Sequence, residues 1–305
     1  MDSSLPLVSI GMPTYNSNNR ILKAFETLMK QGYPNLEIII SDNCSTDNTA
    51  EVCQGLAAQD DRVKFFRQDS NKGVWANFQF VLSKATGKYF MFLADDDRME
   101  PEVLFKYADY LENNQEYSLV SGQLKYWSEN DEFLFYEKDL SMEQPKGWQR
   151  LVWYYRTVVQ GGLWHGMMRT EFAQRIPIRN VIGGDWHFVA TMAYLGKVKN
   201  FEFVSYHKYF GGTSTGFQKY ASRIGASRMA GNFPYVNIAW VAFKEVFFQC
   251  PAFKGTNIFK RFTVAVKSYW AVFKRYYVQP FGKKPKSFTR TQFNALKRVI
   301  KPASD

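Results

Sequence analysis

The segment Lys88–Pro101, KYFMFLADDDRMEP, decides the fold. Its apolar run at 89–93 is short and continuous, as is typical of a strand buried on both faces of a parallel sheet. Three adjacent carboxylates follow at Asp95, Asp96 and Asp97, and their mutual repulsion requires a compensating positive charge nearby. A divalent cation such as Mg²⁺ is one candidate, because it binds carboxylates together with substrate phosphates. The alternative is a solvated acidic turn before the next helix.

Strand and helix patterns alternate through the N-terminal part of the chain. Buried-strand and amphipathic-helix patterns follow one another at 7–12, 21–29, 36–41, 49–58, 62–67, 74–84 and 89–93. This β-α-β-α-β-α-β order predicts an α/β domain with a mostly parallel, doubly wound sheet. In such sheets ligands bind beyond the carboxyl ends of the strands. We therefore expect the loops at 13–16, 42–43 and 95–97 to meet at one edge.

The loop after the first predicted strand reads Pro13-Thr14-Tyr15-Asn16. It carries neither the GxGxxG fingerprint of a dinucleotide-binding fold nor the glycine-rich P-loop. Glycines therefore do not supply a backbone nest for phosphate at this point. A metal ion at the aspartates is expected to supply more of the positive charge that a phosphate-bearing ligand needs.

Four motifs together resemble glycosyltransferase family two. They are PTYN at 13–16, SDNCSTDNT at 41–49, NKG at 71–73 and GKYFMFLADDD at 87–97. They occur in the order and spacing of the family, and the match covers roughly residues 6–215. The resemblance implies an A-type nucleotide-sugar fold and an inverting transfer from a nucleoside diphosphate sugar, usually a UDP-sugar.

The resemblance also implies a nucleotide-sugar site formed by residues of these motifs: Pro13, Thr14, Tyr15, Asn16, Asp42, Asn71, Gly73, Asp95 and Asp96. The Tyr15 ring can stack on a base, and the Asp42 carboxylate can accept a hydrogen bond from a uracil ring N–H. The alternatives are that Tyr15 packs on the sheet edge and that Asp42 caps a helix.

The acidic motif departs from the common family pattern. Many members have Asp-Ser-Asp-Asp where this chain has Ala94–Asp97, so the first carboxylate is replaced by alanine. Asp97 is the expected ligand of Mn²⁺ or Mg²⁺, and Asp95 is expected on the ribose side. Asp96 is the alternative for either role.

A second motif, Ile182–Phe188 (IGGDWHF), places Asp185 at the start of a predicted helix after two glycines. An aspartate there is an ordinary helix cap. In the resembled family an acid at this point is the general base. An inverting transfer needs one carboxylate to take the proton of the acceptor hydroxyl. The resemblance thus implies that Asp185 is catalytic.

The Tyr-Arg-x-His motif of many family members is missing, because residues 209–214 read YFGGTS. Its phosphate or metal contacts would fall to another residue: Lys208, Thr213 or Lys219. Residues 214–228 are expected to form a loop. The three histidines show no paired metal spacing and are expected to be packing or hydrogen-bonding residues.

The C-terminal part differs in charge and pattern. Residues 231–305 carry 14 Lys and Arg against two acids, whereas the rest of the chain is close to neutral. Thr256–Val278 predicts a helix with aromatic residues on one face and lysines on the other, which is typical of an interfacial membrane helix. The alternative is that the aromatic face packs on the catalytic domain. We find no nucleic-acid-binding motif.

We therefore expect three regions: a nucleotide-sugar-binding half (1–127), an acceptor and base half of the same domain (128–230), and a helical, basic, aromatic-rich region (231–305). The three cysteines have neither metal nor disulfide spacing, which favours a reducing compartment. No signal-peptide pattern and no apolar run of about 18 residues is present. These features favour a cytoplasmic protein, with peripheral association at the inner face of the cell membrane.

The sequence predicts an inverting, metal-dependent glycosyltransferase that transfers a sugar to a hydroxyl acceptor in cell-surface polysaccharide or glycolipid synthesis. One alternative is a sugar nucleotidyltransferase, which needs a glycine-rich, basic triphosphate loop that PTYN does not provide. Another is a non-catalytic, membrane-associated binding module with the same fold.

Overall fold

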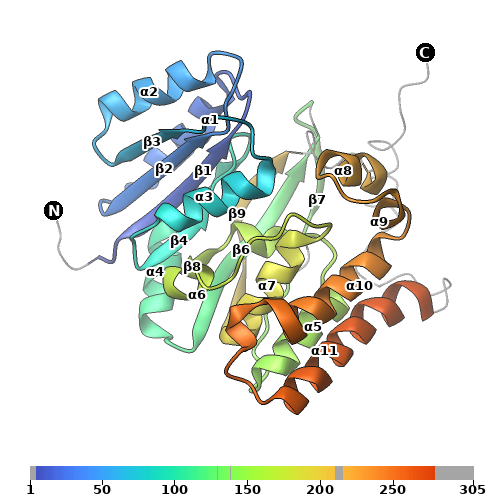
Figure 1. Cartoon of the computed structure of the whole chain (residues 1–305). Helices are drawn as coiled ribbons and strands as arrows, with labels where there is room; N and C mark the ends of the chain where they lie inside the picture. Colours follow the sequence, from blue (N-terminus) through green and yellow to red (C-terminus); the bar gives the residue numbers. More distant parts are fainter. Residues whose placement is uncertain (1–4, 129, 138, 210–215, 279–305) are drawn as a thin grey trace.

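One sheet of nine strands forms the centre of the described residues, 5–128, 130–137, 139–209 and 216–278, in a computed structural model (Figure 1). Its order is β3-β2-β1-β4-β8-β6-β9-β5, with β7 paired to β6. The strands are β1 (Val8–Thr14), β2 (Leu36–Asp42), β3 (Val63–Arg67), β4 (Tyr89–Phe92), β5 (Arg98–Met99), β6 (Tyr117–Trp127), β7 (Phe133–Tyr136), β8 (Met167–Arg169) and β9 (Lys197–Tyr209).

The N-terminal half of the sheet is parallel throughout. β1 pairs in parallel with β2 and β4, and β2 pairs in parallel with β3. Every residue of β1, β2 and β4 is buried, as their continuous apolar patterns predict. Thr14 lies opposite Asp42, and Asp42 lies opposite Arg67, so the carboxyl ends of these strands meet at one edge.

The second half of the sheet is mixed. β6 pairs in parallel with β9, and antiparallel with β7 and β8. β8 also pairs antiparallel with β4 and so joins the two halves. The short strand β5 pairs with β9 at Arg98 and Met99. This pairing brings the residues that follow the acidic motif next to the end of β9.

Helices cover both faces of the sheet, which confirms the predicted doubly wound α/β class. One face carries α1 (Arg20–Met29), α2 (Thr49–Gln59) and α4 (Val103–Asn113), and the other carries α3 (Val74–Lys84), α5 (Gly147–Thr157) and α7 (Gly184–Leu195). Side chains alternate between the two cores, as in a strand with period two. Within β4, Tyr89 and Met91 belong to one core, and Phe90 and Phe92 belong to the other.

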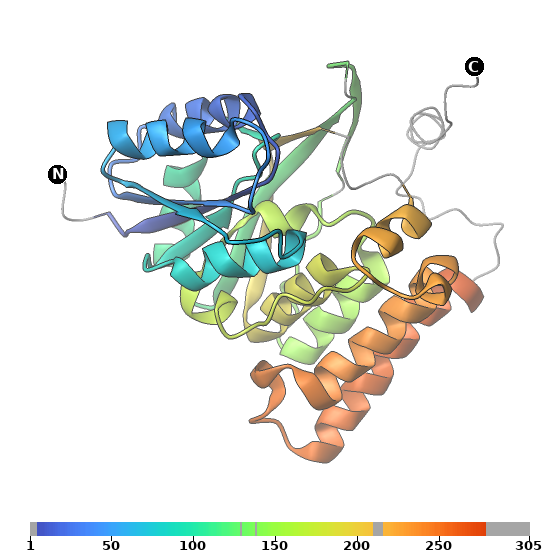
Figure 2. The ribbon, with the colours of Figure 1, turned by 45° about the horizontal axis from the view of Figure 1, so that its top comes forward.

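The C-terminal helices form a hairpin on the α5 and α7 side. α10 (Pro234–Lys244) runs into a π-helical turn at Glu245–Gln249, and α11 (Ile258–Phe273) continues as a π-helical turn to Val278. Figure 2 shows α10 and α11 side by side, with α11 also in contact with α5. Among the described residues, no helix combines the length and apolar character needed to cross a membrane.

The buried face of α11 is formed by small residues. The sequence pattern placed the aromatic residues of this helix on one broad face and left open whether that face meets a membrane or the catalytic domain. In the structure the small residues face the protein: Val264, Ala265, Ser268, Ala271 and Val272. Phe259 is 79% exposed and Phe262 is 50% exposed. Small side chains allow α11 to pack closely on α5 and α10, while Phe259, Phe262 and Trp270 stay exposed. Tyr269 and Phe273 are partly buried against the core.

The structure adds local detail at three places. α4 begins at Val103, after Glu102, which adopts a left-handed conformation with φ 61°. The segment between 128 and 145 contains β7, which pairs antiparallel with β6. The loop expected at 214–228 contains α8 (Phe217–Arg223) and the start of α9 (Arg228–Asn232). Thr213, one expected replacement for the family motif, lies outside the described residues.

Candidate active site

The carboxyl end of β1 is joined to the acidic motif by a direct hydrogen bond. The Thr14 hydroxyl donates to Asp95 Oδ2 at 2.6 Å. Burial raises the pKa of the Asp95 carboxyl, and the neighbouring charge of Asp96 raises it further. Asp96 is partly exposed beside it. The structure therefore brings Thr14, Asp95 and Asp96 together at the strand ends, as the sequence predicted.

Asp42, at the end of β2, is fully buried. Its carboxylate accepts hydrogen bonds from the Ser45 backbone N–H at 3.1 Å and from the Ser45 hydroxyl, and Arg67 Nε lies 3.5 Å away. These bonds close the turn before α2, whose N-cap is Asn48, so Asp42 does not cap that helix. Its contact with a base stays a prediction.

The loop after β1 is held against the turn after β2. Pro13 lies in β1 opposite Ser41. The Asn16 N–H donates to the Ser45 hydroxyl at 2.8 Å, and Asn16 Oδ1 accepts from the Thr46 N–H. Asn16 has φ 48°, a conformation that asparagine tolerates better than most residues. Tyr15, between these fixed points, is 43% exposed and can present its ring to a ligand.

An amide network connects the NKG motif to β2. Asn43 Nδ2 donates to Asn71 Oδ1 at 2.9 Å and contacts the Gly73 carbonyl at 3.3 Å. Asn71 Oδ1 also accepts from the Gly73 N–H, and Gly73 has φ 86°, which favours glycine. Asn77 in α3 donates to the Thr14 and Ser41 carbonyls. Asn43 and Asn77 were not among the predicted site residues, although Asn43 lies within the SDN motif.

Asp97 is the most enclosed of the three acids, with 1% of its surface exposed. Its Oδ2 accepts from Lys208 Nζ at 3.2 Å, and its Oδ1 lies 3.4 Å from the Tyr209 backbone N–H. Burial raises the pKa of Asp97 to about 7, although the Lys208 charge opposes this shift. A lysine on β9 is therefore the nearest cation to the predicted metal ligand.

His165 completes this group from the 3₁₀ turn at Gly162–His165. Its Nε2 lies 3.2 Å from Lys208 Nζ, and its Nδ1 lies 4.0 Å from Asp97 Oδ2. Burial, followed by the Lys208 charge, holds the pKa of His165 well below its usual value, so the ring is neutral. The other two histidines have the structural roles that were predicted, since His187 bonds to Tyr155 and His207 bonds to Trp127.

Asp185 lies in the first turn of α7, as predicted. Two glycines make this turn possible, because Gly183 has φ 74° and a Cβ on Gly184 would clash with the Arg179 carbonyl. Burial raises the pKa of Asp185 to about 6, while backbone N–H groups at the helix start oppose the shift. A carboxylate with this pKa is mostly ionised at neutral pH and still accepts a proton readily.

A second acid, Glu137, lies close to Asp185 and was not predicted. It follows β7 and accepts from the Tyr126 hydroxyl at 3.0 Å and from the Gly162 N–H at 3.2 Å. Burial raises its pKa to about 7, and the charge of Asp185 adds to this shift. No motif in the sequence marks Glu137.

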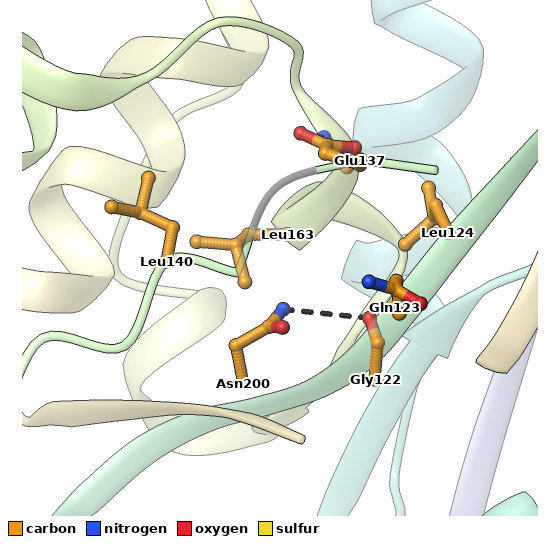
Figure 3. A pocket seen from close by; sticks show the side chains of 8 residues that line it. Gly122, Gln123, Leu124, Glu137, Leu140, Leu163 and Asn200 are labelled. Atoms are coloured by element: carbon orange, nitrogen blue, oxygen red, sulfur yellow. Dashed lines mark hydrogen bonds between the residues drawn. The ribbon is translucent and has the colours of Figure 1, made fainter. Parts of the chain in front are cut away.

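Gly161 and Gly162 separate these two acids. A Cβ on Gly161 would clash with Asp185 Oδ2, and a Cβ on Gly162 would clash with Glu137 Oε2. Below Glu137 is a small cavity (Figure 3), whose other lining side chains are Gln123, Leu124, Leu140, Leu163 and Asn200. The bare backbone at 161–162 allows both carboxylates to approach the same part of the site.

The acids of the acidic motif fit a divalent cation whose coordination is completed by oxygens of the bound donor. Asp97 and Asp95 offer carboxylate oxygens, and Mg²⁺ commonly uses one or two carboxylates together with substrate phosphates. Within the part of the chain that the structure describes, no group of three or more His, Cys, Asp or Glu residues is arranged to hold a metal alone. A cation at Asp97 would therefore depend on oxygens from the bound donor.

The sequence profile of a family described as Glycosyl transferase family 2 matches residues 9–175. The matched range is more than half of the chain and includes the motifs at both strand ends and in the acidic segment. The chain belongs to glycosyltransferase family 2. This result confirms the resemblance that the motifs indicated.

Glycosyltransferases of several bacteria are similar to this chain over part of its length. Glycosyltransferase GlyG of Streptococcus pneumoniae is 28% identical over 130 residues, which are 43% of each chain. The GalNAc(5)-diNAcBac-PP-undecaprenol beta-1,3-glucosyltransferase of Campylobacter jejuni is 38% identical over 96 residues, 31% of each chain. The matched part spans less than half the length of these relatives.

Solved structures extend the similarity in fold to nearly the whole chain. The crystal structure of S. aureus TarS 1–349 is similar with a TM-score of 0.61 at 18% identity, covering 96% of this chain and 80% of TarS 1–349. The same TarS fragment in complex with UDP-GlcNAc gives a TM-score of 0.62 at 17% identity, with the same coverage. The family 2 chain therefore has the predicted A-type glycosyltransferase fold.

Proposed function

We propose that this protein is an inverting glycosyltransferase that transfers a sugar from a nucleoside diphosphate donor, most simply a UDP-sugar, to a hydroxyl acceptor. One observation carries the proposal: Lys208 Nζ donates a hydrogen bond to Asp97, after β4, at 3.2 Å, and the charge of the same lysine acts on Asp185 at the start of α7. Acids for a donor and a base for an acceptor thus share one site. The TarS complex with UDP-GlcNAc supports the choice of donor.

The reaction assigned to this site is a single in-line displacement. The acceptor oxygen attacks C1 of the sugar, and the bond between C1 and the diphosphate oxygen breaks with its electron pair leaving on the diphosphate. Asp185 takes the proton of the acceptor hydroxyl. Because attack comes from the face opposite the leaving group, the configuration at C1 inverts.

On the donor side, Tyr15 is assigned to stack on the base, and Asp95 is assigned to the ribose. Thr14 fixes the Asp95 carboxylate through its hydrogen bond. The buried Asp42 carboxylate has its Ser45 bonds already in place, so its contact with a base would require one of its oxygens to serve two donors.

Asp97 is assigned to hold Mn²⁺ or Mg²⁺ together with the donor diphosphate, which makes the transfer metal-dependent. The bound ion would supply positive charge to the departing diphosphate. Asp97 Oδ1 is the better placed oxygen, because its contact with the Tyr209 N–H is long at 3.4 Å.

The acceptor is proposed to be a lipid-linked or cell-surface glycan that is presented at an anionic membrane. The printed name of the Campylobacter jejuni relative specifies an undecaprenol-linked glycan. The C-terminal hairpin of this chain also bears an aromatic surface, formed by Trp240, Phe243, Phe247, Phe248, Phe259 and Phe262. Five of these rings form a chain of contacts, with ring centroids 4.5–5.7 Å apart. The contacts join Trp240 to Phe243, Phe243 to Phe247, and Phe247 to both Phe248 and Phe262.

Charge complements the aromatic surface. Lys244, Lys254, Lys260 and Arg261 lie in the same segments, and the Arg261 guanidinium lies over the Phe247 ring. Residues 231–278 contain one acid, Glu245, which is buried and paired with Arg179 at 2.9 Å. Basic groups beside exposed aromatic rings suit an anionic lipid surface, where each Lys or Arg contributes about 1 kcal/mol.

A donor panel tests the enzymatic proposal. Purified protein is incubated with UDP-sugars and Mn²⁺, and release of UDP is measured with and without candidate acceptors. We expect the wild-type protein to release UDP and EDTA to suppress this release. In the Asp97→Asn variant, added Mn²⁺ should no longer change the rate of UDP release. Release of pyrophosphate from a nucleoside triphosphate, or nucleotide binding without any turnover, would contradict the proposal.

A further inference from the structure

Lys208 is the cation around which the acids of the site are arranged. It lies near the end of β9, and its charge acts on acids from three separate segments: Asp97 after β4, Glu137 after β7 and Asp185 at the start of α7. Burial lowers the pKa of Lys208, but the charges of Asp97 and Asp96 outweigh this effect and raise it above its usual value.

The contacts of this ammonium leave one of its hydrogen atoms available. A lysine ammonium has three N–H donors. One donates to Asp97 Oδ2 and one to His165 Nε2, each at 3.2 Å. The neutral His165 ring can accept at Nε2 because its Nδ1 then carries the proton. Among the described contacts, nothing uses the third donor.

His165 supports this arrangement from behind. Its ring is buried and packs against Tyr206, with ring centroids 4.7 Å apart. Its Nδ1 is buried and makes no hydrogen bond within the described part of the chain. The His165 ring therefore has no hydrogen-bond partner for Nδ1 among the described residues, while its Nε2 orients the Lys208 ammonium beside Asp97.

Exposure distinguishes Lys208 from a purely structural partner of Asp97. The Asp97 side chain is fully buried, whereas 32% of the Lys208 side chain is exposed. The ion pair is thus open to solvent on the lysine side alone. A ligand anion that enters beside Asp97 would meet the ammonium before it meets the carboxylate.

We propose that Lys208 binds the diphosphate of the donor directly and that this contact persists without a metal ion. This inference rests on the proposed function. In the transfer, the electron pair of the broken C1–O bond moves onto the diphosphate, and Lys208 stabilises that charge by a charge-assisted hydrogen bond. Asp97 and His165 position the ammonium. The missing arginine and histidine of the family motif are replaced, for phosphate contact, by this one lysine.

The test compares nucleotides that differ by one phosphate. Binding of UDP and UMP is measured by calorimetry in EDTA for the wild type, Lys208→Met, Lys208→Arg and a control, Lys199→Met. Lys199 lies on the same strand, is 33% exposed and pairs with Glu143 outside the site. We expect the wild type to prefer UDP over UMP, and Lys208→Met to reduce that preference about tenfold, which is 1.4 kcal/mol. Lys208→Arg and Lys199→Met should keep the preference.

Two results would overturn the inference. One is a Lys208→Met protein that prefers UDP as strongly as the wild type does. The other is an equal loss of UDP and UMP affinity, which indicates a structural role.

Lys208→Gln replaces Lys208→Met if the latter has a lowered melting temperature. Mn²⁺ binding, followed by electron paramagnetic resonance, adds a readout that is independent of activity: Lys208→Met should bind Mn²⁺ with UDP at least as tightly as the wild type. If the wild type bound neither nucleotide in EDTA, the inference would fail; if it bound neither with Mn²⁺ present as well, the proposed function itself would fail.

Discussion

Removing the most exposed rings of the aromatic surface should detach the protein from anionic membranes. The substitutions are Phe248→Ser, Phe259→Ser and Phe262→Ser, made together. These side chains are 65%, 79% and 50% exposed, so they pack little against the protein and their loss should leave the fold intact. Lys244, Lys254, Lys260 and Arg261 are retained, which separates the contribution of the rings from that of charge.

The magnitude follows from the area these rings still expose. Together they present the surface of about two fully exposed phenylalanines, and complete burial of one is worth about 1.5–3 kcal/mol. Partial insertion into the headgroup region should recover about half of that total, or about 1.5–3 kcal/mol. The triple variant should therefore partition about ten- to a hundredfold less to vesicles.

Co-sedimentation with vesicles of phosphatidylglycerol and phosphatidylcholine measures the partition. A matched control removes two comparably exposed aromatic residues elsewhere, Phe133→Ser and Tyr136→Ser, which are 48% and 43% exposed on β7. The control should bind as the wild type does, and wild-type binding should weaken at high salt because the basic groups contribute. Equal vesicle binding by the triple variant and the wild type would refute the assignment of this surface to a membrane.

Three further predictions concern the buried acids. Asp185→Asn should lower the transfer rate about 10²–10⁴-fold while UDP affinity stays unchanged, as measured by steady-state kinetics and calorimetry, because only the base is lost; a rate near that of the wild type would exclude this role. Since the pKa of Asp185 is about 6, kcat/KM should fall about tenfold per unit below pH 6 and level off above it, and a profile without this limb would contradict the assignment. Burial raises the pKa of Glu137 to about 7, so its neutral form stabilises the fold at low pH and this contribution is lost as pH rises through 7. Glu137→Gln should therefore raise the melting temperature by about 2–4 °C at pH 8 and change it little at pH 5. Scanning calorimetry at the two pH values measures the difference.

Much of the donor half was predictable because its signals are local. The helix at Val74–Lys84 was predicted with the bounds that the structure shows. Continuous apolar runs that end at polar residues identify buried parallel strands and the edge where their carboxyl ends meet. Asp185 was predictable as a residue at the start of a helix, since two glycines mark that turn.

The remaining site residues depend on contacts between distant segments. Glu137 approaches Asp185 only because β7 pairs with β6, and no local pattern marks it. Lys208 was one of three predicted candidates for the phosphate or metal contact, but its hydrogen bond to Asp97 spans 111 positions and no local pattern indicates it. The exposure of Phe259 could not be read from periodicity, because a helix with small residues on one side and large apolar residues on another has two faces that are both apolar.

The glycine pair at 161–162 has a consequence for attempts to change acceptor specificity by mutagenesis. Any side chain introduced there would push into Asp185 or Glu137, so libraries that randomise these two positions should yield mostly inactive clones. Exposed positions such as Phe133 and Tyr136 carry no such steric constraint. Sequence diversity for selection experiments is better concentrated on β7, where these two residues lie.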